Sequence, residues 1–193
     1  MERTGDPPRG SCPLTLSLAG RMRKKASEAY RLLNDYVGDL VAGTRSLELF
    51  ETSSLFASVS PSMRVILRRM CLSHLVVTLS KWGELYDRYG AIFPGDVRDA
   101  CQNLRKDLDR RGIRNFRNTV VGHIWDKKRR RPLTVPEIEN RLALIIGDSL
   151  ESFRAWINNP TANKFPETVV AVCERVRDRI GEENGLGPSD LSA

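Results

Sequence analysis

The sequence has few of the residues that build metal and redox sites. It contains two histidines and four cysteines in 193 residues. Glycine-rich phosphate loops and nucleophile elbows are also missing. The cysteines lack the close pairs that zinc sites and redox motifs use, because they lie far apart at Cys12, Cys71, Cys101 and Cys173. We therefore expect free thiols in a reducing compartment, no metal and no cofactor.

Long apolar runs are missing as well. No stretch approaches the roughly 20 apolar residues that a membrane-spanning helix needs. One apolar patch lies near the amino terminus, at residues 14–19, but Glu2 and Asp6 offset the two arginines that precede it. The positive region of a secretory signal is therefore absent. We expect a soluble, cytoplasmic protein without a membrane partner.

The composition, 40% hydrophobic and 28% charged, is typical of a globular protein. Apolar residues recur at three- and four-residue steps, and no alternating strand pattern occurs. We therefore expect an all-α fold, a single-domain bundle of about five to six helices over residues 17–180. Residues 1–16, which contain several prolines, are expected to form a flexible arm, and residues 181–193 a disordered tail.

Capping residues and breaks divide this bundle into helices. Ser60 followed by Pro61 is a good start for one helix, and Thr134 with Glu137 forms a capping box for another. The predicted helices are 18–50, 61–89, one from the break at 94–96 to near Gly112, 113–121, 135–156 and 169–180.

The second predicted helix is apolar around much of its circumference. Besides its main stripe it carries a second one with Met63, Ile66 and Met70. Such a helix belongs in the middle of a bundle. We therefore expect His74, which lies on this helix, to be a buried core histidine rather than a catalytic one.

The positive charge is concentrated in one segment. Residues 98–131 hold twelve lysines and arginines against four aspartates, a local net charge of +8, whereas the whole chain has +7. A basic patch on an otherwise neutral body is typical of a protein that binds a polyanion, most often nucleic acid. The alternative is that the charges only form a solvated surface.

The other histidine lies in this basic segment and is part of a recognisable pattern. His123 follows Arg117 after five intervening residues, and the polar Asn118 stands directly after the arginine. This pattern resembles the HEPN proteins, which carry an arginine, four to six residues and then a histidine, often with a polar residue after the arginine. The resemblance covers roughly residues 61–157, and its specific part is 114–123.

Many HEPN proteins are toxin and abortive-infection nucleases of prokaryotes. The resemblance therefore implies a HEPN-like bundle and a metal-independent endoribonuclease, acting in phage defence or as a toxin. It also implies a homodimer in which both motifs build one cleft, and it suggests a nucleotidyltransferase-like antitoxin as a partner.

The chemistry of the three motif residues suits cleavage of RNA by its own 2′-hydroxyl. His123 titrates near neutrality and can move the proton. Arg117 keeps its charge and offers a fork of donors to the phosphate, while Asn118 can orient either group. On an ideal helix Arg117 and His123 would lie about 120° apart. We expect Gly122 to end or bend the helix, so that the histidine turns back toward the arginine.

Other basic residues of the segment are expected to attract the RNA backbone, and Trp125 could stack on an unpaired base or instead cover the core. The expected RNA-binding residues are Arg110, Arg111, Arg114, Trp125, Lys127, Lys128, Arg129, Arg130 and Arg131. Two alternatives remain open. The same segment could serve a non-catalytic helical module that binds nucleic acid or a partner protein, or the chain could be a helical adaptor whose charges are only surface.

Overall fold

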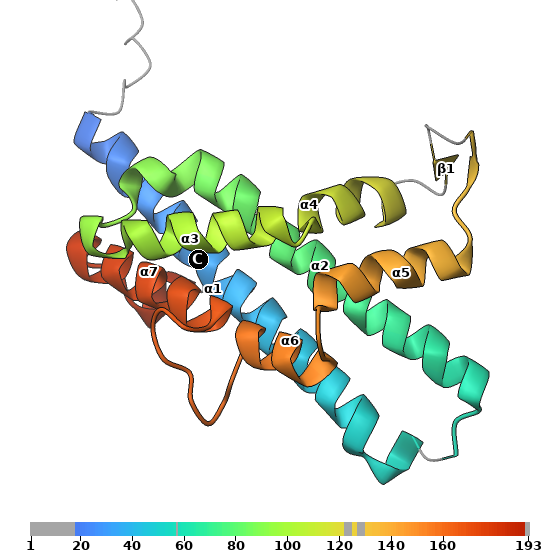
Figure 1. Cartoon of the computed structure of the whole chain (residues 1–193). Helices are drawn as coiled ribbons and strands as arrows, with labels where there is room; N and C mark the ends of the chain where they lie inside the picture. The colour runs from blue at the N-terminus through green and yellow to red at the C-terminus, as the bar shows by residue number, and fades with distance from the viewer. Residues whose placement is uncertain (1–17, 57, 122–124, 127–129, 192–193) are drawn as a thin grey trace, which may run out of the picture.

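The computed structural model describes residues 18–56, 58–121, 125–126 and 130–191. The arm predicted at 1–16 lies outside these residues. Within them the fold is all-α and single-domain, as predicted, with seven α-helices and one minimal pair of strands (Figure 1). None of the described helices combines the length and the apolarity that crossing a membrane requires.

Two long antiparallel helices, α1 (Leu18–Thr52) and α2 (Pro61–Tyr89), form the spine of the molecule (Figure 1). The apolar stripe predicted on α1 faces the core, where Leu33, Leu40 and Leu47 have no exposed surface. The two helices approach closely at Gly43, where an added Cβ would lie 2.6 Å from the Leu75 side chain. A larger residue at this crossing would force the Leu75 side chain to move.

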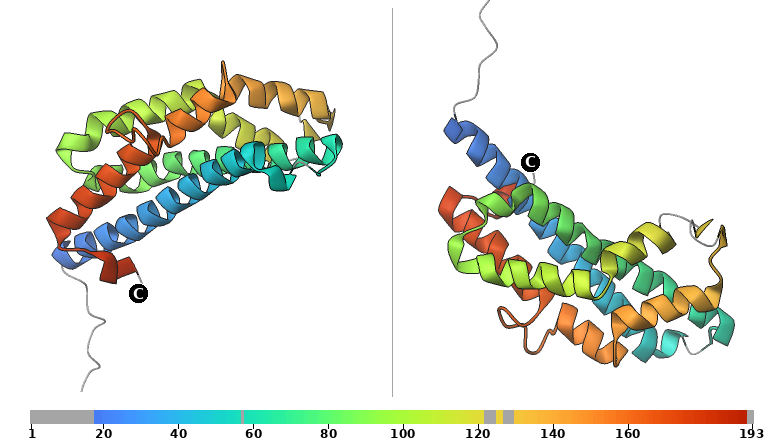
Figure 2. Two further views of the ribbon diagram at one scale, coloured as in Figure 1. Left: turned by 90° about the horizontal axis from the view of Figure 1, so that it is seen from below. Right: turned by 45° about the horizontal axis from the view of Figure 1, so that its top comes forward.

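The remaining helices cover the spine at two ends. α7 (Val169–Asn184) packs along α1, and α3 (Arg98–Arg110) packs against α2 and α7. At the other end lie α4 (Ile113–Phe116), α5 (Val135–Ile146) and α6 (Leu150–Ile157), as both views in Figure 2 show. One continuous cluster of buried apolar side chains joins all of these helices, so the chain has one core.

The two halves of α2 differ, contrary to the prediction that the whole helix lies in the middle of the bundle. Its second half is buried, with Trp82 and Leu79 fully enclosed. Its first half projects beyond the covering helices, so Met63, Ile66 and Met70 are 48%, 42% and 60% exposed. The prediction that His74 is a buried core residue is also wrong, since its side chain is exposed on the solvent side of α2.

The single helix predicted at 135–156 is in fact two helices. Gly147 has a φ of +77°, a conformation that favours glycine, and α5 ends there. Ser149 then caps α6, its side chain accepting a hydrogen bond from the Ser152 amide at 3.0 Å. The apolar spacing continues across this break, which is why the periodicity alone predicted one helix.

The carboxyl-terminal end is more ordered than the sequence predicts. α7 continues to Asn184, beyond the predicted end at 180, and a 3-10 turn, η5 (Pro188–Leu191), follows. Leu186 and Leu191 pack against the core cluster. These contacts hold 181–191 back against α1, where a disordered tail is expected from the sequence alone.

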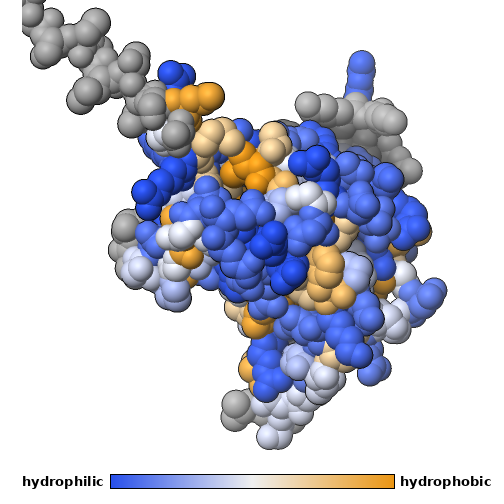
Figure 3. Space-filling model, turned by 90° about the vertical axis from the view of Figure 1, so that its left-hand side faces the viewer, coloured by the Kyte–Doolittle hydropathy of each residue, from blue (hydrophilic) through white to orange (hydrophobic). Residues whose placement is uncertain are grey.

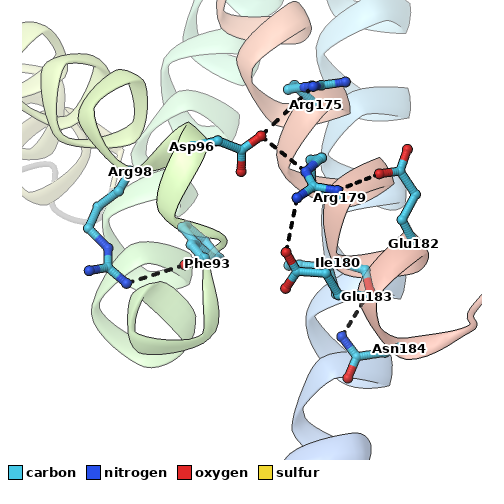
Figure 4. Close-up of polar contacts among 9 residues, drawn as sticks. All are labelled: Phe93, Asp96, Arg98, Arg175, Arg179, Ile180, Glu182, Glu183 and Asn184. Carbon is cyan, nitrogen blue, oxygen red and sulfur yellow. Dashed lines mark hydrogen bonds and ion pairs between the residues drawn. The ribbon is translucent and has the colours of Figure 1, made fainter.

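An ion-pair network joins the start of α3 to α7 (Figure 4). Asp96, in the turn η3 (Gly95–Val97), contacts Arg179 at 3.0 Å and Arg175 at 3.8 Å. Arg179 also contacts Glu182 and Glu183 on its own helix. The hydrogen bond to Glu182, followed by the charge of Asp96, raises the pKa of Arg179. This side of the molecule is mainly hydrophilic, with a small apolar group beside the start of α1 (Figure 3).

The predicted capping box at the start of α5 is confirmed, and it is joined to the strand pair. Arg131, in β2 (Arg131–Pro132), donates to both carboxylate oxygens of Glu137 at 2.7 and 2.9 Å, and the Thr134 amide donates to the same group. These donors, chiefly Arg131, lower the pKa of Glu137 to about 2.

The stability of this corner should therefore depend on pH. Because the pKa of Glu137 is lowered on folding, its contribution is present above the ordinary value near 4.5 and is lost as pH falls toward 2. The urea midpoint of the wild type should fall between pH 5 and pH 2.5. We expect this fall to be smaller in Glu137→Gln. The matched control is Glu139→Gln, an exposed change on the same helix. Equal pH slopes in wild type and Glu137→Gln would contradict the prediction.

Candidate nucleic-acid interface

Arg117 lies where a short helix changes its hydrogen-bonding pattern. α4 is anchored by the buried Ile113 and Phe116, and the next residues form a π-helical turn, η4 (Arg117–Val121). The sequence predicted one helix over 113–121. A widened turn of this kind is uncommon and is frequent at functional sites, and here it begins at the arginine of the motif.

The guanidinium of Arg117 reaches across to α2. Its Nη1 donates to Oε1 of Glu84 at 2.6 Å, and the two side chains are 42% and 64% exposed. The arginine is thus held in one direction but remains accessible to a ligand from solvent. An exposed ion pair of this kind is worth roughly 0–1 kcal/mol, so a phosphate could displace the carboxylate.

Arg117 shares a small cleft between α2, α3 and α4 with two other arginines. We refer to this as the α2–α4 cleft, and its charged lining residues are Glu84, Asp87, Arg105, Asp109, Arg114 and Arg117. The cleft is therefore of mixed charge. The net positive charge of this surface is lower than the sequence of residues 98–131 predicts. The reason is that α2, which lies outside that segment, contributes carboxylates to the cleft.

Within the α2–α4 cleft, Arg105 has a structural role. It forms a short ion pair with Asp87, lies over the Tyr86 ring at 5.4 Å and is only 25% exposed. The hydrogen bond from Arg105 lowers the pKa of Asp87. Arg114, in contrast, is exposed at the surface. Arg114 and Arg117 are therefore the two arginines of the cleft that are best placed to receive a phosphate.

The residues after Arg117 are tied to α5. The Asn118 side chain is exposed next to the arginine. The Thr119 hydroxyl donates to the Asn115 carbonyl at 2.7 Å and accepts from Arg141 of α5 at 2.8 Å. Glu84, Thr119 and Arg141 are thus residues of the site that the sequence analysis does not identify. Glu84 and Arg141 are brought there by the packing of α2 and α5, which no local pattern marks, whereas Thr119 lies within the turn η4 itself.

The two arginines at the end of α3 differ in their surroundings. Arg110 is exposed and pairs with Asp107 on its own helix. Arg111 instead lies over the Trp156 ring at 4.3 Å and donates to the Ile145 carbonyl at 2.8 Å. Burial lowers its pKa. Arg111 therefore joins α3 to α5 and α6, and its guanidinium is engaged where an RNA contact was expected.

The chain forms a minimal pair of antiparallel strands on either side of residues 127–129, which the sequence analysis does not predict. Trp125 pairs with Pro132, and Asp126 with Arg131, between β1 (Trp125–Asp126) and β2. Arg130 is exposed with a φ of +51°, and Arg131 pairs with Glu137. Four expected site residues and the side chain of Trp125 lie outside the described residues. These four are His123, Lys127, Lys128 and Arg129.

The structure thus places Arg114 and Arg117 in one cleft at the end of α4, with Asn118 exposed next in the chain, and Arg110 and Arg111 at the end of α3. The approach of His123 to Arg117 stays a prediction. Among the described cysteines, Cys71, Cys101 and Cys173 are free thiols, as expected. The described part of the chain holds no group of three or more metal-ligating side chains.

No protein-family model and no curated protein matches the chain. Among solved structures, it is similar to an integron cassette protein, Vpc_cass2, from the mobile metagenome of V. paracholerae. The match has a TM-score of 0.63 at 24% identity and covers 82% of this chain and 96% of that chain. At this level of identity the likeness concerns the fold alone, and it supports the helical architecture described above.

Proposed function

We propose that this protein is a metal-independent endoribonuclease of the HEPN type. The observation that carries the proposal is the placement of Arg117, whose guanidinium is solvent-accessible at the end of a short helix, beside Arg114 and the exposed Asn118. An accessible guanidinium fork in this position suits a phosphate. The chain then continues to His123, the second catalytic residue of the proposal.

In the proposed reaction the 2′-hydroxyl of RNA attacks the neighbouring phosphorus. His123 takes the hydroxyl proton, the P–O5′ bond breaks, and the 5′-oxygen receives a proton. The products are a 2′,3′-cyclic phosphate and a 5′-hydroxyl. Arg117 stabilises the charge that builds on the phosphate oxygens, and Asn118 orients one of the reacting groups. Arg110, Arg114 and Arg130 bind the flanking backbone.

A homodimer is part of the proposal, and the exposed face of α2 supports it. Met63 and Met70 are seven residues apart, and two further steps of seven lead through Val77 to Glu84. Seven residues are nearly two turns, so these side chains lie on one side of α2. An exposed apolar stripe of this kind is typical of an interface. A second copy that covers it would reach the ion pair of Glu84 and Arg117.

The biological role that we propose is taken from the resemblance to HEPN proteins. We propose a role as a toxin or in phage defence, with a nucleotidyltransferase-like antitoxin as a possible partner. A toxin of this type should slow growth when it is expressed, and the double variant Arg117→Ala, His123→Ala should not. A normal growth rate with active wild-type protein would contradict the toxin role and leave the nuclease proposal in place.

The nuclease proposal is tested by incubating purified protein with RNA in EDTA. We expect cleavage products that end in 2′,3′-cyclic phosphate, and binding that weakens steeply between 50 and 200 mM salt. RNA binding without cleavage would instead favour the non-catalytic module. If RNA binding responds neither to salt nor to removal of the basic residues 127–131, the hypothesis that the chain is a helical adaptor is favoured.

Removal of the carboxylate beside Arg117 should strengthen RNA binding. Glu84→Gln turns the charged acceptor of the Nη1 contact at 2.6 Å into a neutral amide oxygen and removes a negative charge that repels phosphate. We expect the Kd for RNA at low salt to fall by about three- to tenfold, equivalent to roughly 1 kcal/mol. Fluorescence anisotropy measures this. The control is Glu167→Gln, which removes the same charge from the exposed loop before α7. A Kd that rises in Glu84→Gln would show that Glu84 is needed to position the arginine.

A further inference from the structure

Arg154, a partly buried arginine on α6, has two enclosed donor atoms. The Nε and Nη1 atoms of Arg154 are enclosed by protein, yet they find no hydrogen-bond acceptor among the described residues. A guanidinium keeps its charge at any pH at which the protein is folded. Enclosed donors without acceptors are unfavourable, because desolvation of a charged group is costly.

Arg154 lines an open cleft between α1, α6 and the loop that follows α6. The volume of the cleft is about 810 Å³, within the range of small-molecule sites. α1 contributes Thr44, Arg45 and Glu48, and the loop contributes residues 158–161. Figure 1 shows α6 beside the second half of α1, with α4 and β1 elsewhere in the molecule. The cleft is therefore separate from the site proposed for RNA cleavage.

The cleft contains two carboxylates, and neither contacts Arg154. Glu48 is already paired with Arg45 at 2.7 Å. Thr44 donates to the Leu40 carbonyl and accepts from Asn158 at 3.4 Å. Glu151 lies one turn before Arg154 and also lines the cleft. Arg154 forms no ion pair with Glu151 or with any other carboxylate in the part of the chain that is described.

We propose that this cleft binds a small ligand with an oxyanion group, phosphate or carboxylate, which accepts hydrogen bonds from Arg154. Because Nε and Nη1 are enclosed in the structure, the side chain turns toward the cleft that it lines when the ligand enters. The guanidinium fork then meets two oxygens of one anion, a geometry that lysine cannot reproduce. Asn158 and Thr161 are placed to contact the rest of the ligand.

The test measures binding of inorganic phosphate, and separately of acetate, by calorimetry and thermal unfolding, with sodium chloride at equal ionic strength as control. We expect one of the two anions to bind the wild type and raise its Tm. Arg154→Lys should retain the fold and weaken this binding at least about tenfold. Arg154→Met should remove the binding at this cleft and, without anion, be at least as stable as wild type, since two enclosed donors without acceptors are removed.

The variant Arg117→Ala tests whether anion binding at the Arg154 cleft is independent of the proposed nuclease site. Because Arg117 is itself proposed to receive a phosphate, the anion response is also measured in Arg117→Ala. The part of the response that depends on Arg154 should persist in that variant, since Arg117 does not line the cleft. The proposal is overturned if neither anion binds the wild type, if Arg154→Lys and Arg154→Met bind as the wild type does, or if Arg117→Ala alone removes the response.

Discussion

Replacing Arg117 by alanine is expected to slow RNA cleavage by about 10²–10³, the usual effect of losing one donor that stabilises transition-state charge. The side chain is 42% exposed and its contact with Glu84 is a surface ion pair, so the fold should survive. We expect kcat to fall and KM to change little. Single-turnover cleavage of a labelled RNA, with circular dichroism as the check on folding, measures this.

The matched control is Arg114→Ala. Arg114 is exposed in the same α2–α4 cleft, but it should contact the flanking backbone and not the reacting phosphate. Its loss should therefore raise KM several-fold and leave kcat nearly unchanged. His123→Ala should be as inactive as Arg117→Ala. Cleavage by Arg117→Ala at more than a third of the wild-type rate would mean that the catalytic arginine lies elsewhere.

Replacing Trp82 by alanine is expected to destabilise the protein by about 3–5 kcal/mol. Trp82 has no exposed surface and packs between Tyr36 and Phe93, with ring centroids 6.2 and 6.0 Å away. The residues around such a cavity relax only partially, so most of the lost packing is not regained. Urea unfolding should show the loss, and Tm should fall by about 10 °C.

Trp82→Phe distinguishes the effect of losing side-chain volume from the effect of losing the indole N–H donor. The indole Nε1 is buried and finds no acceptor in the described part of the chain. Phenylalanine removes this unpaired donor and keeps an aromatic ring in the core. We therefore expect a loss of less than about 2 kcal/mol. Equal losses in both variants would indicate that the indole N–H has an unseen partner that stabilises it.

The helices were predictable where local chemistry fixes them. The caps at Ser60 and Thr134 act within four residues, and both are present in the structure. The break at Gly147 was not predictable from periodicity, because the apolar spacing is the same on both sides of it. The exposure of Met70 was also not predictable from the sequence, since it depends on how far the covering helices extend along α2.

The candidate site was predictable only in part, for a related reason. The motif places Arg117 and Asn118 by their position in the chain, and both lie at the surface. Their charge environment is set by Glu84 and Asp87, which α2 brings from about 30 residues earlier. The local charge of the sequence therefore overestimates how basic this surface is.

The return of η5 to α1 has a practical consequence. The described chain begins and ends at the same extremity of the molecule, and the β1–β2 hairpin lies at the opposite one (Figures 1 and 2). A molecule attached to a solid support through residues after Leu191 would present the hairpin and the end of α4 to the solution. Immobilised protein should thus be as suitable as free protein for measuring how RNA associates.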